Sequence, residues 1–192
     1  MSRRTLLGVS AGAAGAWALW RPLPGGAQTA LEPTPACGSD HAPTPSSNEG
    51  PFFSPDSPER ADITEGRFAG QDLLVGGYVL DTACRPVAGA LVEIWQADPG
   101  GDYDNRGNLL RGHQYSDAAG RWLFTSVLPG PYGRRARHVH LKVQRPGGEV
   151  LTTQMFFPGD PAQAGDSQFN PRLLAELSSD QPHSARMDIV LG

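Results

Sequence analysis

The sequence predicts an all-β protein, an antiparallel β-sandwich of about seven or eight strands joined by long loops. Three observations support this prediction. Short apolar runs alternate with turn residues from residue 72 onward, the chain holds 24 glycines and 18 prolines in 192 residues, and no long amphipathic helix interrupts the pattern. Short strands with turn signals between them are typical of sandwiches.

Each expected strand is an apolar or alternating run bounded by turn residues. In chain order the strands are residues 72–80, 90–96, 113–116, 121–127, 138–144, 150–157 and 185–191. The DAAG sequence between the third and fourth runs ends in glycine, which favours a hairpin there. RLLAEL, at 172–177, is expected to form a helical turn. Trp95 and Trp122 lie on strands and are predicted core residues.

Residues 1–27 are expected to be an export signal. They begin with Arg3 and Arg4, continue with an apolar stretch too short to span a bilayer comfortably, and end in small residues. The string SRRTLL resembles the twin-arginine type, which predicts a periplasmic or secreted protein with no membrane contact in its mature form. A buried N-terminal helix is the alternative.

The rest of the chain divides into an arm and a domain. Residues 28–50 are rich in Pro, Ser and Thr and lack an apolar period, so they are expected to be extended. Residues 51–192 form the predicted sandwich. In an oxidising compartment Cys37 of the arm and Cys84 of the domain would form one disulfide, although two unpaired thiols remain the alternative.

The charge balance is acidic. The net charge is −4, and removing the signal, with three arginines and no acidic residue, lowers it to −7. This balance argues against nucleic acid as a partner. No pattern indicates the oligomeric state.

The sequence RHVHLKV places two histidines on one face of a predicted strand. Because side chains alternate along a strand, His138 and His140 point the same way and lie roughly 6–7 Å apart along the backbone. This spacing lets two imidazoles converge on one metal ion. A pair of surface histidines is the alternative, and the motif alone does not decide between them.

Two tyrosines in glycine- and proline-rich loops strengthen the metal interpretation. Tyr103 lies in GGDYDN after one strand, and Tyr132 lies in LPGPYG shortly before the histidines. Ionising a phenol at pH 7 costs roughly 4 kcal/mol, because its pKa is near 10. A trivalent cation can supply this energy, and anionic oxygen ligands favour a hard metal. Two tyrosinates, two neutral histidines and one hydroxide would neutralise Fe(III).

The sequence resembles the intradiol ring-cleavage dioxygenases, and most closely a small exported branch related to protocatechuate 3,4-dioxygenase. The matching segments cover most of residues 46–191. They are NEGPFF (48–53), VAGALVEIWQAD (87–98), GDYDN (101–105), YSDAAGRWLFTSVLPGPYGRRARHVHLKV (115–143) and TTQMFFPGD (152–160). The order Tyr, Tyr, His-x-His is much more specific than any one of these elements.

The resemblance implies a catalytic domain whose loops carry a non-haem Fe(III) centre, one iron per chain. Its ligands would be Tyr103, Tyr132, His138 and His140. Tyr132 would also detach and accept a substrate proton. Arg135 would stabilise negative charge on the substrate, and Gln154 would lie beside the iron.

The implied reaction belongs to aromatic compound catabolism. A catechol-type diol and O2 would react, and the ring would open between the two hydroxyls to give a cis,cis-muconate-type diacid. The connection from Tyr132 to His138 is shorter than in the large protocatechuate enzymes, and the N-terminal helical segment of catechol 1,2-dioxygenases is not apparent. The diol therefore stays open among catechol, protocatechuate, hydroxyquinol and a lignin-derived compound.

Two other functions compete with this interpretation. The stretch GYVLDTACRPVAGALVEIW resembles transthyretin-like modules, which predicts a metal-free binding sandwich. Alternatively, His138 and His140 could join a carboxylate around Fe(II). Neither alternative explains the two tyrosines.

Overall fold

The computed structural model has the predicted all-β fold. It describes residues 42–68, 72–179 and 183–192, so the expected export signal and most of the arm, including Cys37, lie outside the described residues. Within the described parts the strands are β1 (Asp72–Asp81), β2 (Leu91–Gln96), β3 (Arg111–Tyr115), β4 (Arg121–Val127), β5 (His138–Gln144), β6 (Val150–Phe156), β7 (Glu176–Ser178), β8 (His183–Arg186) and β9 (Ile189–Leu191). Two 3-10 helices, η2 (Pro161–Gly165) and η3 (Pro171–Leu173), lie between β6 and β7.

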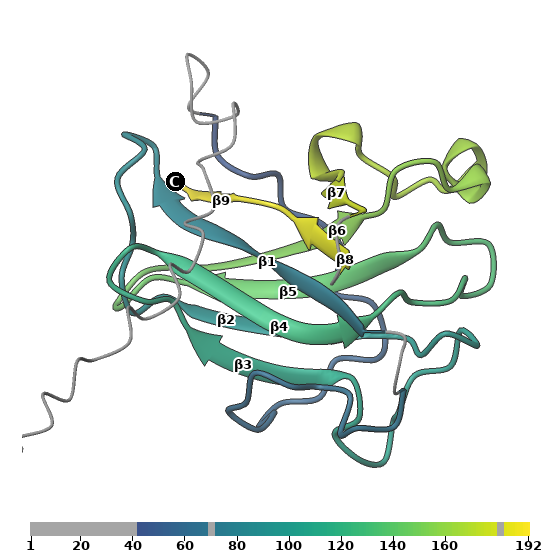
Figure 1. Cartoon of the computed structure of the whole chain (residues 1–192). Helices are drawn as coiled ribbons and strands as arrows, with labels where there is room; N and C mark the ends of the chain where they lie inside the picture. The colour runs from purple at the N-terminus through teal and green to yellow at the C-terminus, as the bar shows by residue number, and fades with distance from the viewer. Residues whose placement is uncertain (1–41, 69–71, 180–182) are drawn as a thin grey trace, which may run out of the picture. The chain divides into compact units, whose positions relative to one another are not determined.

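The strands form two sheets (Figure 1). One sheet has the order β4-β1-β8-β7, with β9 also paired to β1, and the other has the order β3-β2-β5-β6. All pairs in the second sheet are antiparallel. The first sheet is mixed, because β1 runs parallel to both β8 and β9. The predicted antiparallel β-sandwich is therefore confirmed, and within it only the pairings of β1 with β8 and β9 are parallel among the described strands.

The last predicted strand is broken into two. Gly77 of β1 lies so close to the carbonyl of Met187 that any side chain there would collide with it. The chain therefore bends between β8 and β9, and each short strand pairs with a different part of β1. The predicted helical turn at 172–177 is correct only for its first residues, since η3 ends at Leu173 and β7 begins at Glu176.

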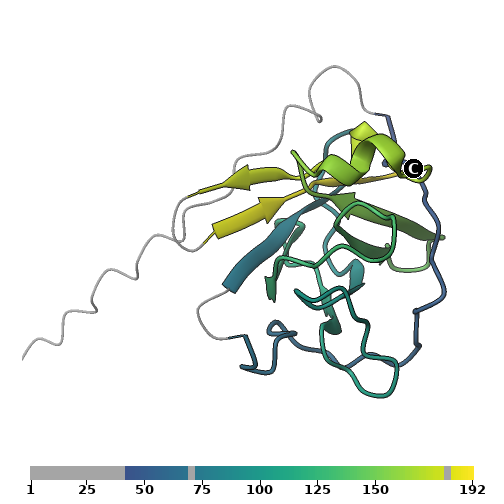
Figure 2. The ribbon, with the colours of Figure 1, turned by 90° about the vertical axis from the view of Figure 1, so that its right-hand side faces the viewer.

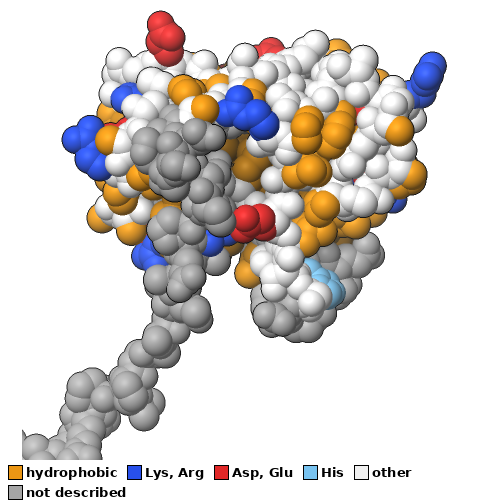
Figure 3. Space-filling view, turned by 90° about the horizontal axis from the view of Figure 1, so that it is seen from above, with side chains coloured by type: hydrophobic (Ala, Val, Ile, Leu, Met, Phe, Trp, Pro, Cys, Tyr) orange, Lys and Arg blue, Asp and Glu red, His pale blue; other side chains and the backbone are white. Residues whose placement is uncertain are grey.

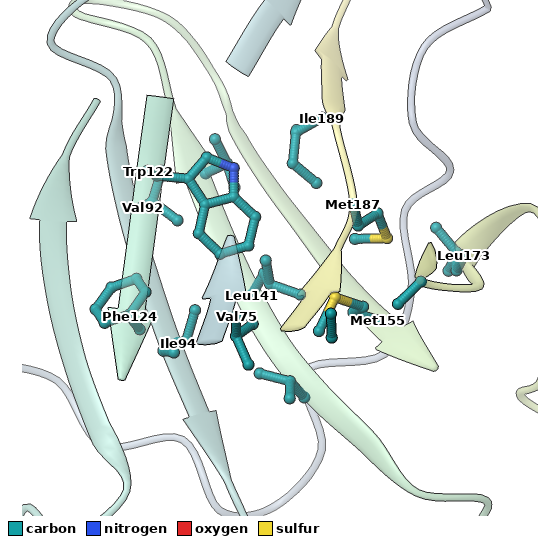
Figure 4. Packing of buried hydrophobic residues seen from close by; sticks show 14 of the residues in the cluster. Val75, Val92, Ile94, Trp122, Phe124, Leu141, Met155, Leu173, Met187 and Ile189 are labelled. Carbon is teal, nitrogen blue, oxygen red and sulfur yellow. The ribbon is translucent and has the colours of Figure 1, made fainter. Parts of the chain in front are cut away.

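The second sheet has two buried faces of different character. Val139, Leu141 and Val143 of β5 point into the sandwich core with Val92 and Ile94 of β2. Figure 4 shows this core, in which Trp122 and Phe124 of β4 and Val75 of β1 pack from the other sheet. The alternate residues of β5, which include both histidines, must therefore face away from the core. They are nevertheless buried, so another part of the chain covers this outer face.

The N-terminal segment, residues 42–68, supplies that cover and also closes the sheet edges. In Figure 2 it runs in blue along one side of the sheets. Thr44 N donates to Val190 O of β9 over 2.9 Å, and Ser47 N donates to Thr152 O of β6 over 2.9 Å. Further along, residues 58–63 bond to β3 and to β4, joining the two sheets. Unpaired strand edges invite association, and this segment occupies them.

The face of the protein seen in Figure 3 has no dominant charge. In Figure 3 positive and negative side chains are interspersed with hydrophobic ones. Among the described residues, no helix has the length and hydrophobicity needed to span a membrane. Cys84, in the turn after β1, is disulfide-bonded. Its expected partner Cys37 is not described, so the pairing stays a prediction.

Candidate metal centre

The two histidines of β5 converge at their outer nitrogens. His138 and His140 are 4% and 2% exposed, and their Nε2 atoms lie 3.2 Å apart. The ring of His140 stacks on Trp95, its partner across β2 and β5, with centroids 4.9 Å apart and planes 4° from parallel. Trp95 is therefore buried on the outer face of the sheet, against a histidine, rather than in the sandwich core.

The hydrogen bonds of His138 indicate its tautomer. Its Nδ1 lies 2.6 Å from the carbonyl oxygen of Ala136, so Nδ1 carries the proton and donates. Nε2 then presents a lone pair toward His140. Nδ1 of His140 is buried without a well-aligned hydrogen-bond partner, although the backbone of Asn48 lies beside it. Such an arrangement, with Nε2 atoms facing each other, is what two imidazoles need to share a cation.

Burial keeps both histidines neutral. It lowers the pKa of His138 to about 4, and the nearby Arg135 acts in the same direction. It lowers the pKa of His140 to about 2, with further contributions from His138 and Arg135. Neutral imidazole is the form that binds metals. At neutral pH the pair is thus ready to bind a cation and resists protonation.

Tyr103 reaches the same point from the loop after β2. Its Oη lies 3.3 Å from His138 Nε2, and its ring stacks on Phe52 with centroids 4.4 Å apart. Burial raises the pKa of Tyr103 above its ordinary value. A buried phenol resists ionisation unless a cation compensates the charge.

Tyr132 lies next to this group on the loop after β4. Its ring makes edge contacts with Phe52 and Tyr103, at centroid distances of 5.0 and 5.6 Å. It is 38% exposed, and its hydroxyl forms no hydrogen bond within the described residues. The structure thus brings three of the four predicted ligands within hydrogen-bond distance and leaves the fourth beside them with a free hydroxyl.

Glycines let the two tyrosine loops pack together. Gly101 has φ of +94°, and a side chain there would collide with the carbonyl of Pro131. A side chain on Gly130 would likewise collide with the backbone of Pro99 and Gly101. The N–H of Gly130 donates to Asp98 O over 2.8 Å. The GGDYD and LPGPY motifs therefore bring Tyr103 and Tyr132 together for steric reasons.

Arg135 and Gln154 are also brought together. Arg135 Nη2 donates to Gln154 Oε1 over 2.6 Å, and Gln154 Nε2 donates to the carbonyl of Asn48 over 2.7 Å. Gln154 lies opposite His140 in the β5–β6 register and is fully buried. Arg135, predicted to face the substrate, and Gln154, predicted to lie beside the iron, thus both border the histidines.

Sequence reasoning missed two residues of this region, Phe52 and Arg111. Phe52 was part of a matched motif but had no assigned role, although its ring touches both tyrosines. Arg111 of β3 is 2% exposed, and it donates to the carbonyls of Asp104 (2.6 Å) and Phe52 (3.4 Å). It therefore joins the segments that carry Tyr103 and Phe52. The signal that could have found it is a lone arginine at the start of an otherwise uncharged strand.

The donor set fits a hard cation better than the alternatives. In the described part of the chain, no cluster of three or more His, Cys, Asp or Glu could hold a metal. An Fe(II) site built from His138, His140 and a carboxylate therefore lacks its carboxylate. The oxygen donors near the histidines are phenols, which fits the predicted tyrosinate–Fe(III) centre.

Comparison with known proteins identifies the family of this chain. A family model described as dioxygenase matches residues 48–190. The chain belongs to the intradiol dioxygenase family. The match begins at Asn48, inside the predicted arm, where the chain starts to cover the histidines.

Named members of the family are about one-third identical to this chain over the aligned residues. Hydroxyquinol 1,2-dioxygenase of Rhodococcus opacus is 38% identical over 146 residues, 62% of this chain and 48% of the relative. The protocatechuate 3,4-dioxygenase beta chain of Burkholderia cepacia is 34% identical over 143 residues, 62% of this chain and 61% of the relative. The chain therefore spans about half the length of the curated relatives it matches.

A solved structure matches over nearly its whole length. The dioxygenase domain of a dioxygenase–carbohydrate-binding protein fusion from the cellulolytic bacterium Streptomyces sp. SirexAA-E is 45% identical, with a TM-score of 0.75. The likeness covers 78% of this chain and 98% of that domain. Nothing in these comparisons favours the metal-free transthyretin-like alternative.

Proposed function

We propose that this protein is an exported Fe(III) dioxygenase that opens catechol-type rings between their two hydroxyls. The observation that carries the proposal is the convergence of His138, His140 and Tyr103. Their neighbouring donor atoms lie 3.2 and 3.3 Å apart on the buried outer face of β5. Tyr132 is the proposed fourth ligand, and one iron would bind per chain.

Charge supports this choice of metal. Both histidines are neutral, and burial opposes ionisation of Tyr103. Binding Fe(III) would displace the phenolic protons of Tyr103 and Tyr132, and with one hydroxide the centre would become neutral. A neutral centre avoids the desolvation penalty of a buried net charge. Metal uptake should therefore release protons in proportion to the iron bound.

The chain's own residues suit the handling of a diol. When bound, Fe(III) supplies the Lewis acidity that makes a chelated diol reactive toward O2. Tyr132 is 38% exposed and its oxygen has no hydrogen-bond partner among the described residues, so the tyrosinate that it would form on metal binding could swing away and accept one substrate proton. Arg135 can donate to negative charge that develops on the ring. Phe52 and Trp95 line the histidines and Tyr103 with aromatic rings and limit the access of water.

The substrate class follows from the family. The relatives named above act on hydroxyquinol and protocatechuate, and others are named catechol 1,2-dioxygenases. We infer a small aromatic diol as substrate. The likeness to a domain from a cellulolytic bacterium supports including lignin-derived diols in the search.

Product analysis tests the function. Purified iron-loaded protein is incubated with catechol, hydroxyquinol and protocatechuate, oxygen uptake is followed, and products are identified by mass and absorbance. We expect a reddish protein and, from catechol, cis,cis-muconate. A yellow semialdehyde would contradict the tyrosinate–Fe(III) proposal, and the absence of product from every diol would favour a binding module.

Export is a separate part of the proposal. It is supported by the twin-arginine-type string at the start of the chain and the small residues near Ala27. We expect the mature protein to begin near Gln28 outside the cytoplasm. N-terminal sequencing of the exported protein tests this, and an intact Met1 there would contradict it.

A further inference from the structure

A buried carboxylate in the β6–β7 connection contacts Arg135 directly. Asp166 follows η2, and its side chain is fully buried. Both of its carboxylate oxygens accept from Arg135 Nε at 2.9 Å. One of them also accepts from Ala136 N at 3.0 Å, and the other from Gln168 N at 2.9 Å. Burial alone would raise the pKa of Asp166, but these hydrogen bonds hold it below its ordinary range.

These contacts leave one edge of the guanidinium available. Arg135 has five N–H donors in a rigid plane. Nε is taken by Asp166 and Nη2 by Gln154, whereas Nη1 has no partner among the described residues. The side chain is 19% exposed, so this free edge is not sealed from solvent or from a ligand. Because Asp166 holds Nε and Gln154 holds Nη2, the two residues together fix the orientation of the guanidinium plane and the direction in which Nη1 points.

A second buried carboxylate, at the other end of η2, does not contact Arg135 and therefore serves as a control for Asp166. Asp160 precedes η2, is nearly as buried, and accepts from Arg137 N (2.7 Å) and Ala162 N (2.9 Å). It therefore holds the same turn before β5 and caps the same helix. It makes no bond to Arg135 or Gln154 within the described residues.

We propose that Asp166 is a positioning residue of the active site, which orients Arg135 so that its Nη1 edge donates to the bound diol. The proposal rests on the function proposed above. Asp166 touches neither substrate nor metal. It acts by removing the rotational freedom of a long side chain before substrate binds, and by balancing the charge of Arg135 while the site is empty of substrate.

A double-mutant cycle tests whether Asp166 acts through Arg135. We expect Asp166→Asn to lower kcat about 10- to 100-fold while iron content stays near the wild-type level, because displacing a charge-stabilising group costs rate. In an Arg135→Ala background the same change should have almost no effect, since the group being positioned is absent. Asp160→Asn should keep kcat near wild type and lower only the melting temperature.

Two outcomes of this cycle would overturn the proposal. One is an unchanged kcat in Asp166→Asn, and the other is an equal loss in the presence and absence of Arg135. If Asp166→Asn does not fold, Asp166→Glu is measured in its place. This variant keeps the charge but displaces the guanidinium, so the same loss of kcat and the same non-additivity are expected.

A second measurement does not depend on turnover. In metal-free protein labelled with nitrogen-15, the Arg135 Nε–H signal is assigned by its disappearance in Arg135→Ala. We expect slow solvent exchange of this proton in the wild type and in Asp160→Asn, and fast exchange in Asp166→Asn. Slow exchange in Asp166→Asn would show that Asp166 does not hold the guanidinium. A protein that oxidises no diol would refute the proposed function, while this experiment would still decide the positioning role.

Discussion

The two halves of the candidate centre are held in different ways. His138 and His140 lie on a central strand, paired on both sides with β2 and β6, and their rings are almost fully buried. Tyr103 and Tyr132 lie on loops that are held by glycine contacts and by the ring of Phe52. The histidines are thus placed by the fold, whereas the tyrosines are placed by their local neighbours.

The two tyrosines also differ from each other. Tyr103 is half-buried, stacked and within reach of His138, whereas Tyr132 is more exposed and its hydroxyl is free. In the proposed centre, the histidines and Tyr103 would form a rigid part that retains the metal, and Tyr132 would be a loosely held ligand that can leave. This division matches the two tasks of binding iron and of accepting a proton from a diol.

The largest effect is expected when the rigid part is broken. His140→Ala removes one nitrogen donor and the stacking partner of Trp95, so we expect loss of nearly all bound iron and of the visible colour. Metal analysis and absorbance spectroscopy check this. His113→Ala is the control, because His113 lies on a strand of the same sheet and bonds Ser57 at 3.2 Å instead. Wild-type iron content in His140→Ala would contradict the assignment of His140.

Replacing the tyrosines one at a time should give unequal effects. Tyr103→Phe should lose most of the iron, because it deletes the oxygen that lies 3.3 Å from His138. Tyr132→Phe should retain more iron and lose turnover instead, since the group proposed to accept the substrate proton is missing. Iron content and kcat measured on both variants check this. Equal iron loss in the two would remove the distinction between a retained and a departing ligand.

The contrast between strand and loop also explains what the sequence could predict. The alternation of side chains along β5 was enough to predict that His138 and His140 lie on the same face, because this alternation is a local property of a strand. The turn-rich loops marked Tyr103 and Tyr132 as candidates, but their assignment as ligands came from the family resemblance, since no local pattern says how two loops meet. The structure supplies the missing reason in Gly101 and Gly130.

Partners that are distant in sequence could not be predicted from local patterns. Asp166 lies 31 residues from Arg135 and contacts it only because the β6–β7 connection folds back onto the turn before β5. Similarly, β1 pairs with β8 and β9 in parallel, a register that depends on the close approach of Met187 to Gly77. The all-β class and six of the strands were nevertheless predicted nearly to the residue, because each is a short run with clear turn residues at its ends.

Lowering the pH should reduce the free energy of unfolding of the metal-free protein, because its two buried histidines resist protonation in the folded state. In the unfolded chain they titrate near 6.5, whereas in the folded protein the pKa of His138 is about 4 and that of His140 about 2. As the pH falls below 6.5, the unfolded state therefore takes up protons that the folded state does not. The free energy of unfolding should drop by about 4 kcal/mol between pH 7 and pH 5 for the pair. Urea denaturation at both pH values checks this, and the double variant His138→Gln/His140→Gln should lose most of the difference.

The smallest expected effect comes from the N-terminal segment where it meets β5. Gly50 has φ of +73°, and a Cβ there would lie 3.1 Å from Cε1 of His140. Gly50→Ala should therefore cost about 1–2 kcal/mol of stability for the left-handed backbone and should also press on the imidazole. Gly147 is the matched control, because its φ is +70° and nothing lies within 4 Å of the added Cβ. Both variants should lose similar stability in denaturant, but only Gly50→Ala should weaken iron binding or shift the visible band. A shift of equal size in Gly147→Ala would mean that the segment does not act on His140 by contact, and that the histidines are held by β5 and its neighbouring strands alone.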